Sequence, residues 1–305
     1  MNHRVSTYLA LVLGVIALST SAIFVKIADA PSSVTAFYRL SFTALVLAPF
    51  LIFDRERCAE LRSLKPGQIG PIVLSGLLLA VHYVMWFESL RYTSVSNSTV
   101  LVALQPLFSL VFAFIFLREK ARRSAIVGCL IAVLGSCIIG WGDFQVSASA
   151  LLGDALSLAA AGVISLYFLI GQIVRKEISA ITYSVPGYCS SAVFLLLYTL
   201  LKGDSLTGYR GTTWAAFLGL ALISTIAGQF IFNLLLKHIS ATAVTMSILG
   251  EPVGTCMLAF FILEERITVQ QLLGIVVILA GLSVFFFYPI WEEHRKCKSS
   301  CLHTP

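Results

Sequence analysis

Ten apolar runs, each about twenty residues long, constrain this chain more than any other feature of its sequence. An α-helix rises about 1.5 Å per residue, so roughly 20 residues cross the ~30 Å hydrocarbon core of a bilayer. Each run must be a helix in lipid, because an open strand would leave backbone groups without hydrogen bonds. The predicted spans are Tyr8–Ile27, Ser33–Phe53, Ile69–Leu90, Val95–Leu117, Ser124–Trp141, Leu151–Val174, Thr182–Leu201, Trp214–Leu236, Ala241–Leu263 and Thr268–Tyr288.

The composition excludes a soluble protein. Hydrophobic residues make up 58% of the 305 residues and charged residues only 12%, whereas an ordinary soluble domain has about 45–50% and about 25%. Ten crossings use up the chain and leave no room for a separate soluble domain. The net charge of +6 is spread over the loops between the runs, so it indicates membrane topology and not a nucleic-acid partner.

The distribution of Lys and Arg predicts the orientation, because cytoplasmic loops are enriched in these residues. With the N-terminus inside, fifteen basic residues lie in the inner segments and four in the outer ones. The inner residues are Arg4, Arg55, Arg57, Arg62, Lys65, Arg118, Lys120, Arg122, Arg123, Arg175, Lys176, Lys237, Arg295, Lys296 and Lys298; the outer residues are Arg91, Lys202, Arg210 and Arg266. We therefore expect a multi-pass protein of the cytoplasmic membrane with both termini in the cytoplasm.

The two halves of the chain repeat each other with a shift of 146 residues. The shift pairs Ser94 with Ser240, Pro106 with Pro252, Glu119 with Glu265, Gly128 with Gly274, and Gly135 with Gly281. Each repeat contains five predicted helices, an odd number, so the second copy enters the membrane upside down. We expect an all-α integral membrane fold of ten transmembrane helices, arranged as two inverted five-helix repeats (residues 1–145 and 146–291) around a central cavity, with a polar cytoplasmic tail at 292–305.

These motifs resemble the EamA-type branch of the drug/metabolite transporter superfamily over nearly the whole chain. The resemblance rests on Leu90-Arg91-Tyr92-Thr93-Ser94, Pro106, Leu117-Arg118-Glu119, Gly128 and Gly135, and in the second copy on Ser240, Pro252, Glu264-Glu265, Gly274 and Gly281. It implies a carrier with a central cavity that commonly exports amino acids or related metabolites. The family often has a Trp in the middle of its first helix, where this chain has Ser19-Thr20-Ser21.

Glu251, between Gly250 and Pro252 and halfway along the ninth span, is the sharpest single feature. A carboxylate near the bilayer centre costs about 2.5–3.5 kcal/mol on insertion scales, and such acids are usually functional. Pro252 removes a backbone donor, so this segment predicts a helix break with free carbonyls. The functional interpretation is a site for a proton or a substrate amine; the structural alternative is a neutral Glu at a packing kink. The repeat mates, Gln105 and Pro106, form an uncharged second break.

Two further stripes are candidates for the walls of a substrate cavity. His82, Tyr83 and Trp86 share one face of the third span, because residues three and four apart are neighbours on a helix. Gln229 and Asn233 recur at a four-residue step in the eighth span, and Tyr167 in the sixth is a weaker candidate. Hydrogen bonding between helices is the alternative explanation for the Gln and Asn, and core packing for Tyr167.

The remaining intramembrane signals have mostly structural explanations. Lys26 and Arg39 lie near the ends of their spans, so we expect them to reach the interface with their long side chains; the alternative for Arg39 is a contact with a substrate carboxylate. Glu119 and Glu265 end their helices and are expected to cap them or to pair with basic loops. The glycines at a seven-residue spacing, Gly128/Gly135 and Gly274/Gly281, predict close helix packing.

The sequence thus predicts a secondary transporter of small metabolites that works by alternating access. Efflux of amino-acid-like compounds is favoured by the resemblance, with proton coupling at Glu251. An uptake carrier for a vitamin- or nucleoside-like metabolite is the alternative, and a non-transporting receptor or assembly factor is a more distant one. We find no nucleotide-binding, hydrolase or metalloprotease motif, and expect no enzyme activity, cofactor or metal. The expected partners are a small-molecule substrate and the lipid bilayer, and a homodimer stays open.

Overall fold

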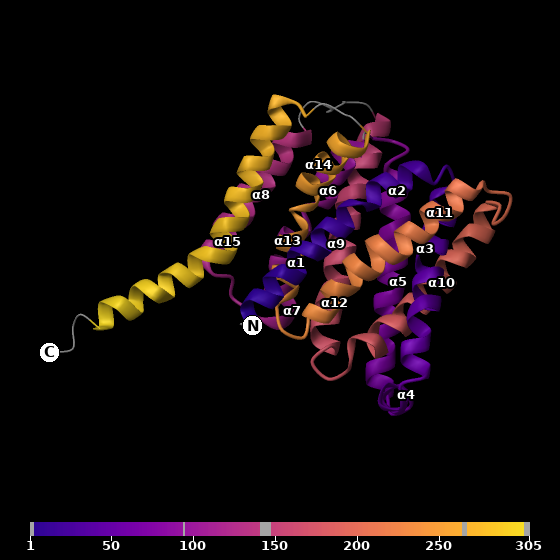
Figure 1. The fold of residues 1–305 in the computed structure, drawn as a ribbon, viewed down its shortest axis with the longest axis horizontal. Coiled ribbons are helices and arrows are strands. Elements are labelled where there is room, and N and C mark those ends of the chain that lie inside the picture. Colours follow the sequence, from indigo (N-terminus) through magenta and orange to yellow (C-terminus); the bar gives the residue numbers. More distant parts are fainter. Residues whose placement is uncertain (1–2, 94, 141–147, 264–266, 302–305) are drawn as a thin grey trace.

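The computed structural model describes residues 3–93, 95–140, 148–263 and 267–301, and this part of the chain contains helices and no strand. Figure 1 shows a single bundle with one long C-terminal helix that extends away from it. The helices are α1 (His3–Ser19), α2 (Ser21–Ile27), α3 (Ser32–Ile52), α4 (Arg55–Arg62), α5 (Pro66–Ser89), α6 (Val95–Val102), α7 (Gln105–Leu117), α8 (Arg123–Gly140), α9 (Ala148–Val174), α10 (Ala180–Lys202), α11 (Gly211–Gly219), the π-helix η2 (Leu220–Phe230), α12 (Ile231–Leu235), α13 (Ala241–Ile248), α14 (Glu251–Leu263) and α15 (Val269–Cys301).

Nine helical stretches within the described residues are long and apolar enough to cross a membrane, which makes this an all-helical membrane protein fold. They are Val5–Ile27, Ser32–Ile52, Pro66–Ser89, Ser98–Leu117, Ser149–Val174, Ala180–Lys202, Gly211–Leu235, Ala241–Leu258 and Val269–Tyr288. The remaining predicted run, the fifth, corresponds to α8, whose apolar part, Arg123–Ile139, is shorter than the nine spans. The predicted repeat partners Ser94 and Glu265 lie outside the described residues.

Several predicted spans are interrupted in the structure. The first predicted span is interrupted at Thr20, between α1 and α2. The fourth is interrupted between α6 and α7, and the ninth between α13 and α14. Pro106 and Pro252 are each the second residue of the helix that follows the interruption. Proline has no backbone N–H to donate, and the first turn is where a helix does not need one.

The prediction of one regular helix over Trp214–Leu236 is wrong in its middle. Leu220–Phe230 is a π-helix, flanked by α11 and α12. The Thr225 hydroxyl donates to the carbonyl of Leu220, five residues earlier, at 2.8 Å. Because π-helical turns in otherwise regular helices are frequent at functional sites, this segment is a place to look for one.

Helices from the two halves of the chain pack against each other throughout the bundle. The paired elements are α8 with α15, α5 with α9, α3 with α10, α1 with η2, and α7 with α13, and Figure 1 shows α8 and α15 side by side. Glycines let α8 and α15 touch through their backbones: a Cβ added to Gly135 would lie 2.8 Å from the carbonyl oxygen of Gly274. The predicted close packing of these glycines is confirmed.

Two segments outside the predicted spans are also helical. Arg55–Arg62, between the second and third predicted spans, forms α4, whose first turn is capped by the Asp54 carboxylate: it accepts from the backbone N–H of Glu56 at 3.0 Å. Past the last predicted span, α15 continues through Cys301, into the segment 292–305 that was predicted as a polar tail. The end of the bundle that carries α4 also holds the start of α5 and of α10 (Figure 1), and we call it the α4 end.

Glu60 joins α4 to the start of α10. Its carboxylate accepts from the backbone N–H of Ser179 at 2.7 Å and from the hydroxyl of Thr182. Burial alone would raise the pKa of Glu60, but these hydrogen bonds and the positive charge of Arg175 outweigh it and lower the pKa below its usual 4.5. The carboxylate therefore stays charged where it caps α10, and it fastens the α4 segment to the bundle.

Candidate functional site

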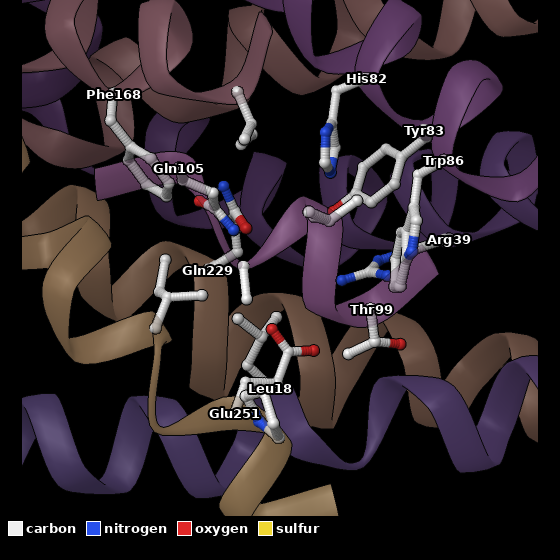
Figure 2. A pocket seen from close by; sticks show the side chains of 15 residues that line it. Leu18, Arg39, His82, Tyr83, Trp86, Thr99, Gln105, Phe168, Gln229 and Glu251 are labelled. Atoms are coloured by element: carbon white, nitrogen blue, oxygen red, sulfur yellow. The ribbon is translucent and has the colours of Figure 1, made fainter. Parts of the chain in front are cut away.

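A cavity lies where the helix interruptions meet, inside the bundle (Figure 2). Its volume is about 30 Å³, which is room for only one or two water-sized molecules. The side chains that line it come from both halves of the chain. They are Leu18, Arg39, His82, Tyr83, Trp86, Thr99, Val102, Ala103, Gln105, Ile164, Phe168, Gln229, Ile248, Glu251 and Pro252.

Most of the site residues predicted from the sequence meet at this cavity. His82, Tyr83 and Trp86 reach it from α5, Gln105 from α7 and Gln229 from η2. Glu251 and Pro252 reach it from the start of α14. The helix-break residues Pro106 and Gly250 are direct neighbours of the lining residues but do not line the cavity themselves.

The α5 side of the cavity is an aromatic wall. The rings of His82 and Trp86 are nearly parallel, with centroids 6.0 Å apart and an interplanar angle of 23°. The Nδ1 atom of His82 lies 3.0 Å from the carbonyl oxygen of Ala160 on α9. Since that carbonyl can only accept, Nδ1 carries the proton in this arrangement, and the ring is held in one orientation toward the cavity.

Glu251 is the first residue of α14, and Figure 2 shows its carboxylate pointing into the cavity. Its own backbone carbonyl accepts from the hydroxyl of Ser19, at 3.2 Å, across the interruption between α1 and α2. No hydrogen bond joins the carboxylate to another described residue. This hydrogen bond joins the α1–α2 interruption to the start of α14, and the Glu251 carboxylate faces the cavity.

For Arg39 the interpretation that the sequence favours is wrong. We expected its side chain to extend to the membrane interface, but the structure buries it completely, at 0% exposure, and places it in the cavity lining. Its Nε donates to the hydroxyl of Thr225 at 2.8 Å and its Nη1 to that of Ser21 at 2.9 Å. The guanidinium also lies over the ring of Tyr83, 4.6 Å from the centroid. Hydroxyls from two distant parts of the chain turn it inward, and nothing in the local sequence around Arg39 shows this.

The cavity has more polar atoms than the described residues can satisfy. Eight buried side-chain atoms of the described residues have no hydrogen-bond partner, and four of them belong to lining residues: Arg39 Nη2, Trp86 Nε1, Gln229 Nε2 and Gln105 Oε1. The other four are Ser109 Oγ, Ser136 Oγ, Tyr183 Oη and Asn233 Oδ1. Buried polar groups are paired in the great majority of cases, so each exception needs an explanation. Four exceptions around one cavity indicate a site that is completed by another molecule.

Tyr167 and Asn233, which we predicted as substrate contacts, do not line the cavity. They form a polar cluster next to it, in which Tyr167 neighbours the lining residue Gln229. The amide of Asn233 lies 2.6 Å from the hydroxyl of Tyr167, 3.0 Å from that of Ser184 and 3.3 Å from that of Tyr188. All four side chains are buried. The cluster joins α9, α10 and α12, which is the helix-to-helix bonding that stood as the alternative for Asn233.

Polar contacts also join the helices toward the α4 end. Gln172 of α9 donates through Nε2 to the Glu119 carboxylate at 3.2 Å and accepts through Oε1 from the backbone N–H of Ala241 at 2.6 Å. The buried Arg175 donates through Nε to the Asn233 carbonyl at 2.9 Å. Burial lowers the pKa of Arg175, and the negative charge of Glu60 partly offsets this by raising it. Glu119 was expected to cap its helix or to pair with a basic loop, and its carboxylate accepts instead from Gln172.

The described residues contain no group of three or more His, Cys, Asp or Glu side chains that could hold a metal ion. The ring and polar groups that line the cavity are the aromatic wall of α5, one acid, one buried guanidinium and two amides.

The chain is similar to one family of transporters over nearly its whole length. The model of the EamA-like transporter family matches residues 5–141 and again residues 151–287. The uncharacterized transporter YyaM of Bacillus subtilis is 25% identical over 257 residues, which cover 82% of this chain and 83% of that protein. An uncharacterized transporter of Archaeoglobus fulgidus is 22% identical over 92% of this chain and 96% of its own length. The S-adenosylmethionine uptake transporter of Rickettsia bellii is 27% identical over 65% of this chain and 75% of its own length.

One crystal structure superposes with a TM-score of 0.78 over 93% of this chain and 98% of the other, at 16% sequence identity. At this identity the likeness shows a shared fold. The family model covers nearly the whole chain in two consecutive matches, and the named relatives are transporters. This chain therefore belongs to the EamA-like transporter family of the drug/metabolite transporter superfamily, as its sequence motifs predict.

Proposed function

We propose that this membrane protein is a secondary transporter that carries small amino-acid-like metabolites by alternating access, with proton coupling at Glu251. The observation that carries the proposal is the cavity at the meeting point of the helix breaks, lined by Glu251, Arg39 and unpaired amide and indole groups. Sites of this kind, at discontinuous helices in the middle of the bundle, are typical of secondary transporters.

The proposal includes ten crossings and two inverted repeats, residues 1–145 and 146–291. The packing of the helices supports this. Under the 146-residue shift α1 corresponds to α9 and η2 to part of α5, and both α1 with η2 and α5 with α9 are packed pairs. The pairs α7 with α9 and α1 with α14 correspond in the same way. In this arrangement α8 is the short fifth crossing and α15 its repeat mate.

Alternating access requires the cavity to expand, since about 30 Å³ holds no metabolite. In the proposed cycle the bonds of Gln172 to Glu119 and to Ala241 close the bundle at the α4 end. Opening toward that side breaks these bonds and separates α9 from α7 and α13. Opening toward the other side leaves them intact.

Proton coupling in the proposed cycle depends on the charges around Glu251. The ionisable groups that share its cavity are Arg39, His82 and Tyr83. A proton and a substrate ammonium group compete for the same carboxylate, so binding one releases the other. Such competition exchanges substrate for protons and supports efflux. Uptake is the second candidate, and it is favoured by one relative, which is named as an S-adenosylmethionine uptake transporter.

The proposed function is tested by flux in proteoliposomes. Purified protein is reconstituted, and accumulation of radiolabelled amino acids, their amines and S-adenosylmethionine is measured with an imposed pH gradient of either sign. We expect accumulation of at least one amino-acid-like compound, and we expect it to vanish when an ionophore collapses the gradient. A protein that is correctly inserted but moves none of these compounds in either direction contradicts the proposal.

We also propose that both termini and the α4 end face the cytoplasm, as the fifteen-to-four distribution of Lys and Arg favours. In a variant without native cysteines, a cysteine at Ser63 or Ser124 is expected to be shielded from an impermeant thiol reagent in whole cells. A cysteine at the exposed Thr207 is expected to react. Permeabilised cells provide the control, since there all three sites react. Labelling of Ser63 but not of Thr207 in intact cells reverses the assignment.

A further inference from the structure

We propose that Arg39 is the binding residue for a carboxylate group of the substrate, so that the carrier selects small molecules with a negatively charged group. This inference rests on the proposed function, because it assigns the chemistry of the same cavity. Trp86 and Gln229 supply the neighbouring donors. A purely cationic compound lacks the group that this part of the site binds.

The buried charge of Arg39 has no counter-ion at ion-pair distance within the described residues. Its side chain is 0% exposed, and the ion pairs of the described part of the chain involve Arg57, Arg91 and Lys202. The Arg39 partners, Ser21 and Thr225, are neutral hydroxyls. Glu251 lines the same cavity but lies beyond ion-pair distance of Arg39. Burying a charge without a close counter-ion is expensive, so an anion that enters the cavity is favoured beside this guanidinium.

The unpaired atoms of the cavity have the polarity that an anion requires. Three of the four are donors, namely Arg39 Nη2, Trp86 Nε1 and Gln229 Nε2. Since Nε and Nη1 of Arg39 are already used by hydroxyls, the guanidinium is held in position with Nη2 free. Hydrogen bonds from a charged donor to a carboxylate are roughly twice as strong as neutral ones.

A purely structural role for Arg39 is the alternative, and Arg175 shows what such a role looks like in this chain. Arg175 is also buried, at 4% exposure. Its Nε, Nη1 and Nη2 donate to the carbonyls of Asn233, Ile178 and Leu234, and none of these nitrogens is left without a partner. Arg39 keeps one nitrogen free, and that nitrogen belongs to a cavity-lining residue.

The experiment compares three probes that differ only in charged groups: 3-phenylpropionate (carboxylate), L-phenylalanine (carboxylate and amine) and phenethylamine (amine). Their binding to the purified full chain is measured by the ligand-dependent rise in melting temperature. We expect both carboxylates to stabilise the parent protein. Arg39→Gln is expected to weaken the binding of both by about tenfold to a hundredfold, and to leave phenethylamine binding within about twofold.

Three variants separate binding from folding. Arg39→Lys keeps the charge and is expected to retain carboxylate binding in part, and Trp86→Phe removes one donor and is expected to weaken it by severalfold. Arg175→Lys is the matched control: it lowers the melting temperature but leaves the carboxylate-induced rise unchanged. If Arg39→Gln does not fold, the Lys and Phe variants decide the question.

The experiment distinguishes failure of the anion site at Arg39 from failure of the proposed transport function. If phenethylamine binds and is driven by a pH gradient while neither carboxylate binds, the protein is a proton-coupled transporter and the anion site is wrong. Equal loss of all three probes in Arg39→Lys and Trp86→Phe also overturns the inference, because it assigns these residues to the shape of the cavity.

Discussion

Replacing Glu251 by glutamine is expected to reduce pH-gradient-driven accumulation to the level of empty liposomes. Glutamine has the shape of the protonated acid but cannot release a proton, so the carrier can no longer exchange protons for substrate. The side chain points into the cavity, and its carboxylate makes no hydrogen bond with another described residue, so the substitution should leave folding and insertion intact. The measurement is flux at equal protein content, with and without the gradient, together with exchange of substrate for substrate.

Glu60→Gln is the matched control for this experiment. Glu60 is also a partly buried carboxylate, but it caps α10 at the α4 end and does not line the cavity. Because its pKa is lowered in the folded protein, its contribution to stability is present above the pKa of the unfolded chain and is lost as the pH falls. The control should therefore lose stability at neutral pH and keep its proton coupling. Full gradient-driven accumulation by Glu251→Gln shows that Glu251 is structural.

Gly281→Ala is expected to destabilise the protein by about 2–3 kcal/mol, a large effect for one methyl group. A Cβ at this position would lie 2.7 Å from the carbonyl oxygen of Gly128 and even closer to the backbone nitrogen of Ala132. Backbone atoms cannot rotate away as a side chain can, so α8 and α15 must separate. Loss of the folded fraction during titration with a denaturing detergent measures the effect.

Gly67→Ala provides the control in α5, at a glycine that is not followed by a proline. A Cβ there would meet nothing within 4 Å, and Ala is favoured over Gly within a helix by roughly 0.5–1 kcal/mol. The same chemical change is thus expected to have opposite signs at the two positions. If both variants are equally stable, the backbone contact between α8 and α15 does not contribute to the stability of the fold.

The sequence could predict the membrane-spanning helices because their length and apolar character are local properties. It could also predict that Pro106 and Pro252 begin new helices, since the missing N–H is a property of the residue itself. It could not predict the π-helix at Leu220–Phe230. That stretch is as apolar as its neighbours, and its hydrogen-bond pattern depends on contacts with α1 and α3.

The same distinction applies to the site. His82 and Trp86 were correctly placed on one face because they are four residues apart on one helix, and both line the cavity. For Arg39 and Asn233 the sequence left two interpretations open, and the reason is the same for both. The position of each side chain depends on hydrogen bonds to hydroxyl groups elsewhere in the sequence. The partners are Ser21 and Thr225 for Arg39, and three hydroxyls of α9 and α10 for Asn233.

The two hydroxyl bonds of Arg39 have a mechanical consequence. Arg39 belongs to α3, Ser21 to α2 and Thr225 to η2, so a single side chain links three helices from both halves of the chain. A rotation of any one of them relative to the others would break a buried bond to a charged donor, which costs about 1.5–3 kcal/mol. During a transport cycle these three helices are therefore expected to travel as one rigid body. The surfaces that separate must then lie elsewhere, as at the contacts of α9 with α7 and α13, where the proposed cycle breaks the bonds of Gln172.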